Sequence, residues 1–304
     1  MITGRLGRTD LDVTWLGLGC VEIDTISDES PGHLAIDGNA KLLNAVLDTG
    51  INVIDTAECY EDSEVLIGRA LGPRRREFHL FTKCGHARGW ARADWRPAPL
   101  LASIERSLRR LETDYLDLIQ LHSCSLNELR RGDAVAALER ARDRGWARYI
   151  GYSGDGAAAR YAVECGRFDT LQTSVSIADQ EALELTLPPA RGRQMGVIAK
   201  RPLANAAWRH ARKPAEPYDQ TYWSRLRTLD YPFLRDTPDT GVATALRFTL
   251  SVPGVHTAIV GTTKPGRWQQ NAALLQPGAL PPGEFERIRA RWREVADASW
   301  EGQV

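Results

Sequence analysis

The chain has 304 residues, of which 43% are hydrophobic and 26% are charged, so it is long enough to bury a large core. Lysine and arginine together number 39, as do aspartate and glutamate, and this balance argues against a protein that binds nucleic acid or an anionic membrane. No apolar run approaches the roughly 20 residues of a membrane span, and the N-terminus has no apolar signal core. The five cysteines are scattered singly, so no disulfide framework is expected. These features indicate a soluble, cytoplasmic protein.

The first part of the chain alternates between predicted strands and helices. Extended runs over 2–6 and 11–18 flank a Gly-Arg-Thr-Asp turn, which predicts a hairpin leading into a strand that ends at Gly19 and Cys20. A polar loop is expected to about Gly38, and a helix over 40–47. Residues 51–54 predict a buried strand that ends at Asp55, and residues 63–71 predict the helix after it.

The same alternation continues to the C-terminus. Further strands are predicted over 78–82, 115–121, 149–152, 171–175, 197–199 and 257–260. Further helices are predicted over 99–111, 134–141, 157–163, 242–250, 267–275 and 284–298. Two segments fit the pattern less well. Pro188 and Pro189 are expected to interrupt any helix over 183–190, and the aromatic-rich segment 204–240 is expected to be irregular.

Eight predicted strands that alternate with helices indicate a parallel sheet with right-handed crossovers. The sequence Gly-Leu-Gly-Cys at 17–20 lacks the third glycine of a dinucleotide-binding turn and runs into a loop, which disfavours an open doubly wound sheet. We therefore predict an α/β fold, a closed (β/α)8 TIM barrel with an N-terminal β-hairpin and a C-terminal extra helix. Residues 1–304 are expected to form this single domain, with the active site at the C-terminal ends of the strands.

Ionisable side chains follow three consecutive strands at the point where each strand ends. Asp55 follows the second barrel strand, Lys83 the third and His122 the fourth, while Tyr60 lies on the loop after Asp55. Adjacent strands lie about 4.8 Å apart, so these four side chains (the tetrad) can converge on one spot. Each alone has an ordinary explanation, such as a helix cap, a solvated lysine, a rim histidine or a packed tyrosine. Their coincidence favours a catalytic site.

The tetrad predicts proton transfer through Tyr60. A phenol has a pKa of about 10, so its anion must be stabilised before it acts near neutral pH. An ammonium about 4 Å away contributes on the order of 4 kcal/mol at an effective dielectric constant of about 20, or roughly three pKa units. Lys83 is the expected cation, Asp55 is expected to hold it, and His122 is expected to orient a substrate oxygen. The chain offers no obvious nucleophile, so an external hydride donor is expected.

Four stretches of the chain together resemble those of one enzyme family, the aldo-keto reductases. The N-terminal hairpin and first strand of that family are similar to RLGRTDLDVTWLGLG, and its strand-and-tyrosine signature to GINVIDTAECYEDSEVLIGRAL. Its third and fourth strand ends are similar to FTKCG and DLIQLH. The resemblance covers essentially the full length and implies reversible NADPH-dependent reduction of aldehydes or ketones. It also implies that the tetrad supplies the family's catalytic aspartate, tyrosine, lysine and histidine.

The resemblance further implies that the chain binds NADP(H). The cofactor-binding positions that it implies are Gly19, Cys20, Asp55, Ser153, Gly154, Gln172, Lys200, Arg201, Pro202, Leu203, Gly261, Thr262, Thr263, Lys264, Arg267, Gln270 and Asn271. Ser153 and Gln172 match positions that hold the carboxamide. Residues 261–263 open a helix whose N-terminus is suited to an anion, and the positions from 267 to 271 hold the adenosine end.

Three positions depart from the family's pattern, the third being Gly261, which occupies the position where many members carry the phosphate-binding lysine. Gly154 replaces an asparagine that holds the carboxamide, and Lys200 replaces an aromatic residue that stacks on the nicotinamide. Trp208 or Trp223 is then a candidate for stacking, and Lys200 and Arg201 are candidates for contacting the pyrophosphate.

The choice between the two nicotinamide cofactors depends on cations that meet the 2′-phosphate of NADP. Lys264 and Arg267 follow the last strand, and no acid lies between Gly261 and Leu275. The sequence therefore predicts a preference for NADPH over NADH.

The substrate pocket is expected to come from loops that carry large aromatic residues. Such residues are Trp90 and Trp95 after the third strand, Trp223 in the segment 204–240, and Trp300 near the C-terminus. Trp90 and Trp223 are expected to line the pocket together with Tyr60 and His122, which favours an apolar, ring-bearing or sugar-like substrate.

Two other function classes fit parts of the sequence. A nicotinamide-binding regulatory subunit with little turnover, like the β subunits of potassium channels, would keep the fold and the cofactor. A metal-dependent barrel hydrolase could use the cysteines near the strand ends, which are Cys20, Cys59, Cys84 and Cys124. Isolated cysteines at a packed rim are more often apolar fillers, so no metal site is predicted.

Overall fold

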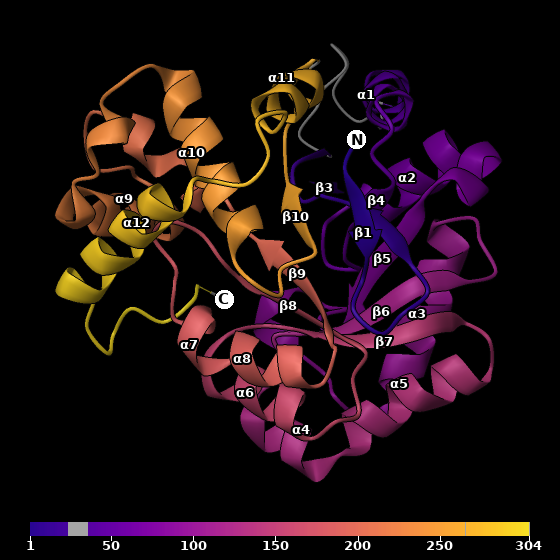
Figure 1. The fold of residues 1–304 in the computed structure, drawn as a ribbon. Helices are drawn as coiled ribbons and strands as arrows, with labels where there is room; N and C mark the ends of the chain where they lie inside the picture. Colours follow the sequence, from indigo (N-terminus) through magenta and orange to yellow (C-terminus); the bar gives the residue numbers. More distant parts are fainter. Residues whose placement is uncertain (24–35, 265, 304) are drawn as a thin grey trace.

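The architecture is a closed barrel of parallel strands surrounded by helices, seen in a computed structural model that describes residues 1–23, 36–264 and 266–303 (Figure 1). The barrel strands follow one another in the order β10-β3-β4-β5-β6-β7-β8-β9. Their bounds are β3 (Leu16–Gly19), β4 (Val53–Asp55), β5 (His79–Cys84), β6 (Leu116–His122), β7 (Ala147–Ser153), β8 (Thr170–Ser174), β9 (Gly196–Lys200) and β10 (Thr257–Val260). The predicted (β/α)8 barrel is therefore confirmed.

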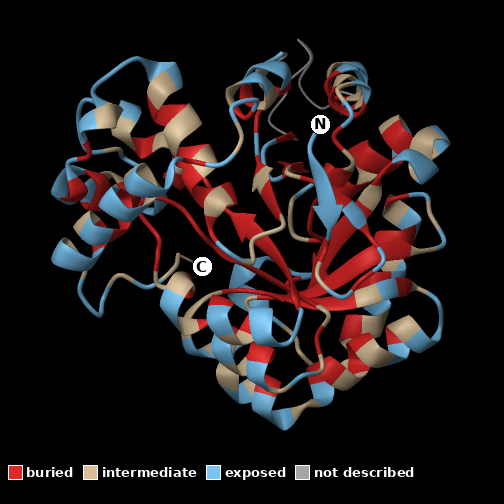
Figure 2. Ribbon diagram, in the orientation of Figure 1, coloured by how far each residue is buried: buried red, intermediate tan, exposed pale blue. Residues whose placement is uncertain are grey.

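An antiparallel hairpin precedes the barrel, as predicted, and covers the end where the barrel strands begin. Its strands are β1 (Thr3–Arg5) and β2 (Asp12–Thr14). A separate buried cluster joins the hairpin segment to side chains of the barrel strands, with the members Leu6, Leu11, Val13, Val53, Phe81, Leu118 and Ile198. Figure 2 shows that the barrel strands are mostly buried and that exposed residues lie on the outer helices. The polar groups at the opposite end of the strands are therefore the ones open to a ligand.

Helices connect the strands on the outside of the barrel. They are α1 (Ile36–Asp48), α2 (Ser63–Leu71), α3 (Pro97–Arg110), α4 (Leu126–Arg131), α5 (Asp133–Asp143), α6 (Gly156–Glu164), α7 (Ala182–Leu185), α8 (Leu187–Gly192), α9 (Pro217–Leu229), α10 (Pro238–Ser251), α11 (Arg267–Leu274) and α12 (Pro282–Val295). The predicted C-terminal helix is α12. In Figure 1, α9, α10 and α12 gather on one side of the barrel, and the chain after α12 returns toward the strands. None of the described helices combines the length and apolarity that crossing a membrane requires.

Three expectations about local structure were wrong or incomplete. Residues 204–240 are not irregular, because they contain α9 and two short 3₁₀ helices, η4 (Ala204–Arg209) and η5 (Pro232–Leu234). The stretch 183–190 is interrupted as expected, since α7 ends at Leu185 and α8 begins at Leu187, but Pro188 and Pro189 lie inside the first turn of α8, where a missing N–H costs nothing. The helix α4 was not predicted, although Ser125 accepts a hydrogen bond from the Glu128 N–H as its N-cap. Most of the expected polar loop before Gly38 lies outside the described residues.

Candidate active site

The barrel brings the ends of β4, β5 and β6 together, as the sequence predicts. Asp55 ends β4, Lys83 precedes the last residue of β5, and His122 ends β6. Lys83 pairs in register with Gln120 of β6, and His122 pairs with Ser153 of β7. The three ionisable side chains therefore belong to one rim of the barrel.

Asp55 and Lys83 form a buried ion pair. The Lys83 Nζ donates to Asp55 Oδ1 at 2.5 Å and to the Thr56 carbonyl at 2.8 Å, and both charged residues are 1% exposed. Burial opposes the charge on Lys83, but the adjacent Asp55 and Tyr60 together outweigh this effect and raise the pKa of the ammonium above its ordinary value. Lys83 is therefore a fixed cation, as predicted.

Tyr60 lies beside this pair, with the Lys83 Nζ 5.2 Å from the centre of its ring. Although Tyr60 keeps some exposed surface, burial raises the pKa of its phenol above the ordinary value, and Lys83 only partly opposes that rise. The expectation that Lys83 brings the phenol close to neutrality is wrong for this structure. The reason is that burial of the phenol outweighs the effect of Lys83, and that Asp55 also raises the pKa of Tyr60. Tyr60 consequently keeps its proton at neutral pH.

His122 completes the tetrad as a neutral imidazole. Its ring centre lies 5.8 Å from that of Tyr60 in an edge-on arrangement, and its Nδ1 lies 3.6 Å from the Cys59 Sγ. Burial, followed by the nearby Lys83, lowers the pKa of His122 well below its ordinary range. His122 can therefore exchange hydrogen bonds with a substrate oxygen at neutral pH, but it does not carry a positive charge there.

Aromatic rings surround His122 on the side of the β5–α3 loop. The Trp90 ring centre lies 4.5 Å from those of both His122 and His86, and Trp95 lies 5.4 Å from His86. Trp95 packs directly on Gly85, where a Cβ would meet its ring at 2.1 Å. Trp90 is 51% exposed and lies against His122, and its contact with a substrate stays a prediction.

The other tryptophans considered for the site lie within the segment 204–240. Trp223, in α9, donates from its indole N–H to the His210 carbonyl at 2.9 Å. Trp208, in η4, is adjacent to Gly241 of α10. Among the described residues, neither indole makes a ring contact or hydrogen bond with Tyr60 or His122. Their contacts hold this segment together.

Ser153 and Gln172, expected to hold a carboxamide, are joined to Asp55. The Ser153 hydroxyl donates to Gln172 Oε1 at 2.9 Å, and the Gln172 amide donates to Asp55 Oδ2 at 2.7 Å. The missing asparagine at Gly154 has a steric reason, because a Cβ there would meet the Tyr152 hydroxyl at 2.5 Å. Tyr152 thus fills the space that a side chain at 154 would need.

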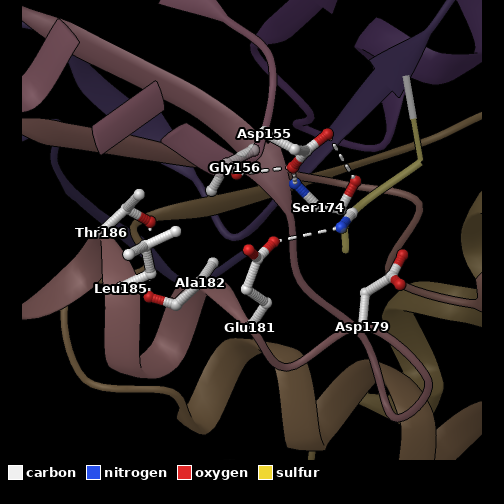
Figure 3. Close-up of a pocket in the computed structure, with 10 residues that line it drawn as sticks. Asp155, Gly156, Ser174, Asp179, Glu181, Ala182, Leu185 and Thr186 are labelled. Carbon is white, nitrogen blue, oxygen red and sulfur yellow. Dashed lines mark hydrogen bonds between the residues drawn. The ribbon is translucent and has the colours of Figure 1, made fainter. Parts of the chain in front are cut away.

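The end of β9 is a cluster of charges that already have partners within the chain. The buried Lys200 pairs with Asp155 at 2.7 Å, and burial lowers the pKa of Lys200 to about 8. Lys200 and Arg201 both donate to the carbonyl of Gln303, so the C-terminal segment lies on the two cations that the sequence offered to the pyrophosphate. Figure 3 shows Asp155 beside Ser174, with Glu181 directed toward the same segment. Lys200 thus bonds to both Asp155 and Gln303, and Arg201 bonds to both Ser174 and Gln303.

The backbone after β9 is strained. Arg201, Ala204, Asn205 and Ala206 all have positive φ angles, between 44° and 56°. Such angles are rare outside glycine and concentrate at functional sites. Pro202 is buried and Leu203 half-buried within this turn.

The turn between β10 and α11 is the remaining candidate for a cofactor contact. Gly261 lies against Gly19 of β3, and a Cβ on Gly261 would meet the Gly19 carbonyl at 3.4 Å. Arg267 is the first residue of α11, and Lys264 is exposed. Within the described part of the chain, Arg267 and Lys264 form no ion pair with a carboxylate. Such a cradle of small residues, unpaired cations and a helix N-terminus fits an anionic group. The remaining expected positions lie here too, namely Thr262 and Asn271, which are buried, Thr263, which is half-buried, and Gln270, which is exposed, while Cys20 is buried at the end of β3.

One charge near this turn is not visible in the linear sequence. The Glu22 carboxylate, from the loop after β3, lies 3.7 Å from where a Cβ on Gly261 would be. No acid lies between Gly261 and Leu275 in the sequence, as stated above, but the fold brings the Glu22 carboxylate close to Gly261.

Four further polar residues of the site were not predicted. Gln120 lies two positions before His122 on β6, and its amide faces Asp55 at 3.5 Å. Alternation along the strand could have identified it, since residues two apart share a face. Glu58, His86 and Asp155 are loop residues with buried partners, and no periodicity marks them in the sequence.

Metal binding was the alternative raised by the cysteines. In the described ranges, no group of three or more His, Cys, Asp or Glu residues is arranged to hold a metal ion. Burial raises the pKa of the Cys20 and Cys84 thiols, which makes the thiolate form that a metal needs unfavourable.

Comparison with known proteins identifies the family. A sequence model of the "Aldo/keto reductase family" matches residues 16–293. The chain is 26% identical to the uncharacterized oxidoreductase YqkF of Bacillus subtilis over 95% of this chain and 96% of that protein. It is 29% identical to the NADH-specific methylglyoxal reductase of Escherichia coli, over 65% of this chain and 66% of that one. The structure of the aldo-keto reductase AKR11C1 from Bacillus halodurans (holo form) matches with a TM-score of 0.83 and 25% identity, over 99% of both chains. The chain belongs to the aldo/keto reductase family.

Proposed function

We propose that this protein is an NADP(H)-dependent oxidoreductase that reduces an aldehyde or ketone, or oxidises the corresponding alcohol or sugar. The observation that carries the proposal is Tyr60 held between the Asp55–Lys83 ion pair and the neutral His122. A proton donor beside a fixed cation suits a carbonyl oxygen that gains negative charge in the transition state.

In the reducing direction Tyr60 is the general acid. Its raised pKa keeps the phenol protonated, so it can donate its proton to the substrate oxygen as hydride reaches the carbonyl carbon. Lys83 stabilises the phenolate that remains, and Asp55 keeps Lys83 in place. His122 orients the substrate oxygen. The nicotinamide cofactor, when bound, supplies the hydride.

The reverse reaction needs Tyr60 as a base. Because the pKa of Tyr60 is raised, the phenolate is scarce at neutral pH, and alcohol oxidation is expected to speed up as the pH rises toward that pKa. Carbonyl reduction, which uses the protonated phenol, is therefore expected to need no rise in pH above neutrality.

The cofactor is proposed to lie along the strand ends from β7 to β10. Ser153 and Gln172 would meet the carboxamide, and Arg267 and Lys264 would meet the phosphate that distinguishes NADP from NAD. Glu22 near Gly261 opposes that preference, and the related methylglyoxal reductase is NADH-specific. We nevertheless propose NADPH, because the turn carries two cations, Lys264 and Arg267, against the one carboxylate of Glu22.

The broader expectations stay part of the same proposal. Residues 1–304 are proposed to act as one aldo-keto reductase-like domain in the cytoplasm. Its partner would be a small-molecule carbonyl or alcohol substrate, with no role for nucleic acid or membranes.

The experiment that tests the proposal is NADPH oxidation against a panel of aldehydes, ketones and sugars, with NADH run in parallel. Turnover of at least one carbonyl compound, faster with NADPH, is expected. Tight NADPH binding without turnover of any compound would instead support the regulatory subunit.

A further inference from the structure

Glu58 is a buried carboxylate with an unusual number of partners. It lies on the β4–α2 loop two residues before Tyr60, and it is 5% exposed. Its Oε1 accepts hydrogen bonds from the backbone N–H groups of Gly85 at 2.7 Å and His86 at 2.9 Å. Its Oε2 accepts from Ser103 and from Arg106 of α3, the latter at 2.9 Å. The carboxylate therefore ties the Tyr60 loop to the β5–α3 loop and to α3.

The backbone of Glu58 adds two further links to the same neighbours. Its N–H donates to the Lys83 carbonyl at 3.2 Å, and its own carbonyl accepts from Arg110 of α3 at 3.2 Å. The loop that carries Tyr60 is thus bonded directly to the strand end that carries Lys83.

His86 extends this connection to the third strand of the tetrad. Its Nε2 lies 2.7 Å from the His122 carbonyl, which can only accept, so Nε2 carries the proton and donates. His86 is 5% exposed, and its Nδ1 has no hydrogen-bond partner among the described groups. The His86 ring therefore bonds to the backbone of His122, and the Glu58 carboxylate bonds to the backbone of His86.

We propose that Glu58 is a positioning residue that, with His86, fixes the spacing between Tyr60, Lys83 and His122. This inference rests on the proposed function, since it concerns the geometry in which Tyr60 gives up its proton. Its physical basis is that proton transfer and charge stabilisation depend on separation, and a displacement of about 1 Å can cost about 10²-fold in rate.

Glu64 provides a matched control in the same segment. It is also buried at 1% exposure, and it also bonds to a hydroxyl, that of Thr82 at 2.8 Å, and to an arginine of α3, Arg110 at 3.5 Å. Unlike Glu58, its carboxylate has no bond to a backbone N–H of the β5–α3 loop among the described residues. Loss of either carboxylate removes a buried charge, but only Glu58 joins the loops of the tetrad.

The test is a double-mutant cycle between Glu58→Gln and Lys83→Met, read as kcat and KM for carbonyl reduction. Glu58→Gln is expected to lower kcat about tenfold with KM changed less than about threefold, because positioning acts on the transition state. In the Lys83→Met background, Glu58→Gln is expected to change kcat less than about threefold, because the spacing between Tyr60 and Lys83 no longer matters and only the spacing to His122 remains. Glu64→Gln is expected to lower the melting temperature while kcat stays near that of the wild type.

Each outcome decides the matter. If the losses multiply, or if Glu64→Gln lowers kcat as much as Glu58→Gln, Glu58 is only structural and the inference fails while the proposed function stands. If the wild type reduces no carbonyl compound, or if Tyr60→Phe retains activity, the proposed function fails and takes the inference with it. If Glu58→Gln does not fold, Ser103→Ala takes its place, because it keeps the carboxylate and removes one of its hydrogen-bond donors. Its effect on kcat is expected to be smaller, and again smaller in the Lys83→Met background than in the wild type.

Discussion

The rim of the barrel has two halves whose polar groups are satisfied in different ways. On β4, β5 and β6, the charges of Asp55 and Lys83 neutralise each other within neighbouring strands. On β7, β8 and β9, Lys200 is neutralised by Asp155, and both Lys200 and Arg201 bond to Gln303, which follows Lys200 by 103 positions. The first half is the one proposed to transfer a proton, and its ion pair is complete within the strand ends, whereas the cations of the second half are engaged by the C-terminal segment.

This difference implies a division of labour. Substitutions on the β4–β6 half are expected to change the chemical step and its pH dependence. Substitutions on the side of β7–β10 are expected to change cofactor binding and leave the pH dependence alone, except at Gln172, which donates to Asp55. The predictions below test that division.

The largest effect is expected from Tyr60→Phe. Removing the hydroxyl deletes the proton donor with little change in volume, so kcat is expected to fall about 10²-fold or more. NADPH binding, measured by fluorescence titration, is expected to stay within about twofold of the wild type. Retention of more than a few per cent of turnover would show that Tyr60 is not the acid.

Lys83→Met is expected to have the next largest effect. Because Lys83 lowers the pKa of Tyr60 against the opposing effect of burial, its removal raises that pKa further. Alcohol oxidation, which needs the phenolate, should then reach its plateau at higher pH than in the wild type, and kcat at neutral pH should fall at least about tenfold.

A control is needed because Lys83→Met leaves Asp55 buried without its partner, at a cost of about 3–5 kcal/mol. The double variant Asp55→Asn/Lys83→Met removes that unpaired charge and is expected to recover melting temperature but not activity. A pH–rate profile of unchanged shape in both variants would show that Lys83 does not influence the phenol.

Arg267→Ala addresses the cofactor side of the comparison. A charge-assisted bond to phosphate contributes about 1.5–3 kcal/mol, so the variant is expected to lose about tenfold or more in its preference for NADPH over NADH. The pH profile should not move. Lys264→Ala, at an exposed position, is the matched control and is expected to lose less. Equal use of both cofactors by the wild type would contradict the proposed preference.

The smallest effects are expected from the tryptophans. Trp90 contacts His122, so Trp90→Ala should change relative kcat/KM across the substrate panel by several-fold with little change in melting temperature. Trp223 is bonded within its own segment, so Trp223→Ala should mainly lower the melting temperature. If Trp223→Ala changes the order of preferred substrates instead, α9 reaches the pocket.

Features that depend on neighbouring residues could be predicted from the sequence, whereas features that depend on contacts between distant residues could not. The tetrad was identifiable because each member lies at a strand end or one loop away, where local pattern is informative. The raised pKa of Tyr60 was not, because it depends on burial and on the nearby Asp55, which pairs with Lys83. Neither the burial of Tyr60 nor the contact between Asp55 and Lys83 can be read from the spacing of residues along the chain.

The helix α9 was missed for a related reason. It buries Arg225, whose guanidinium pairs with Asp179, 46 positions earlier, so its buried face does not look apolar. An arginine in a helical pattern is normally taken as exposed. Only the fold brings Asp179 close enough to offset the cost of burying the Arg225 charge. The same is true of Lys200 and its partner Asp155.

The central claim is that hydride moves to a carbonyl carbon while Tyr60 supplies the proton. The most direct measurement is the transfer of deuterium to the carbinol carbon of the product from NADPH that carries deuterium at both positions of nicotinamide C4, followed by mass spectrometry in the wild type and in Tyr60→Phe. We predict deuterium at the carbinol carbon with the wild type, and formation of this product slowed about 10²-fold or more in the variant although it binds the cofactor. Product without deuterium from the wild type, or equal rates of labelled product from both proteins, would contradict the claim.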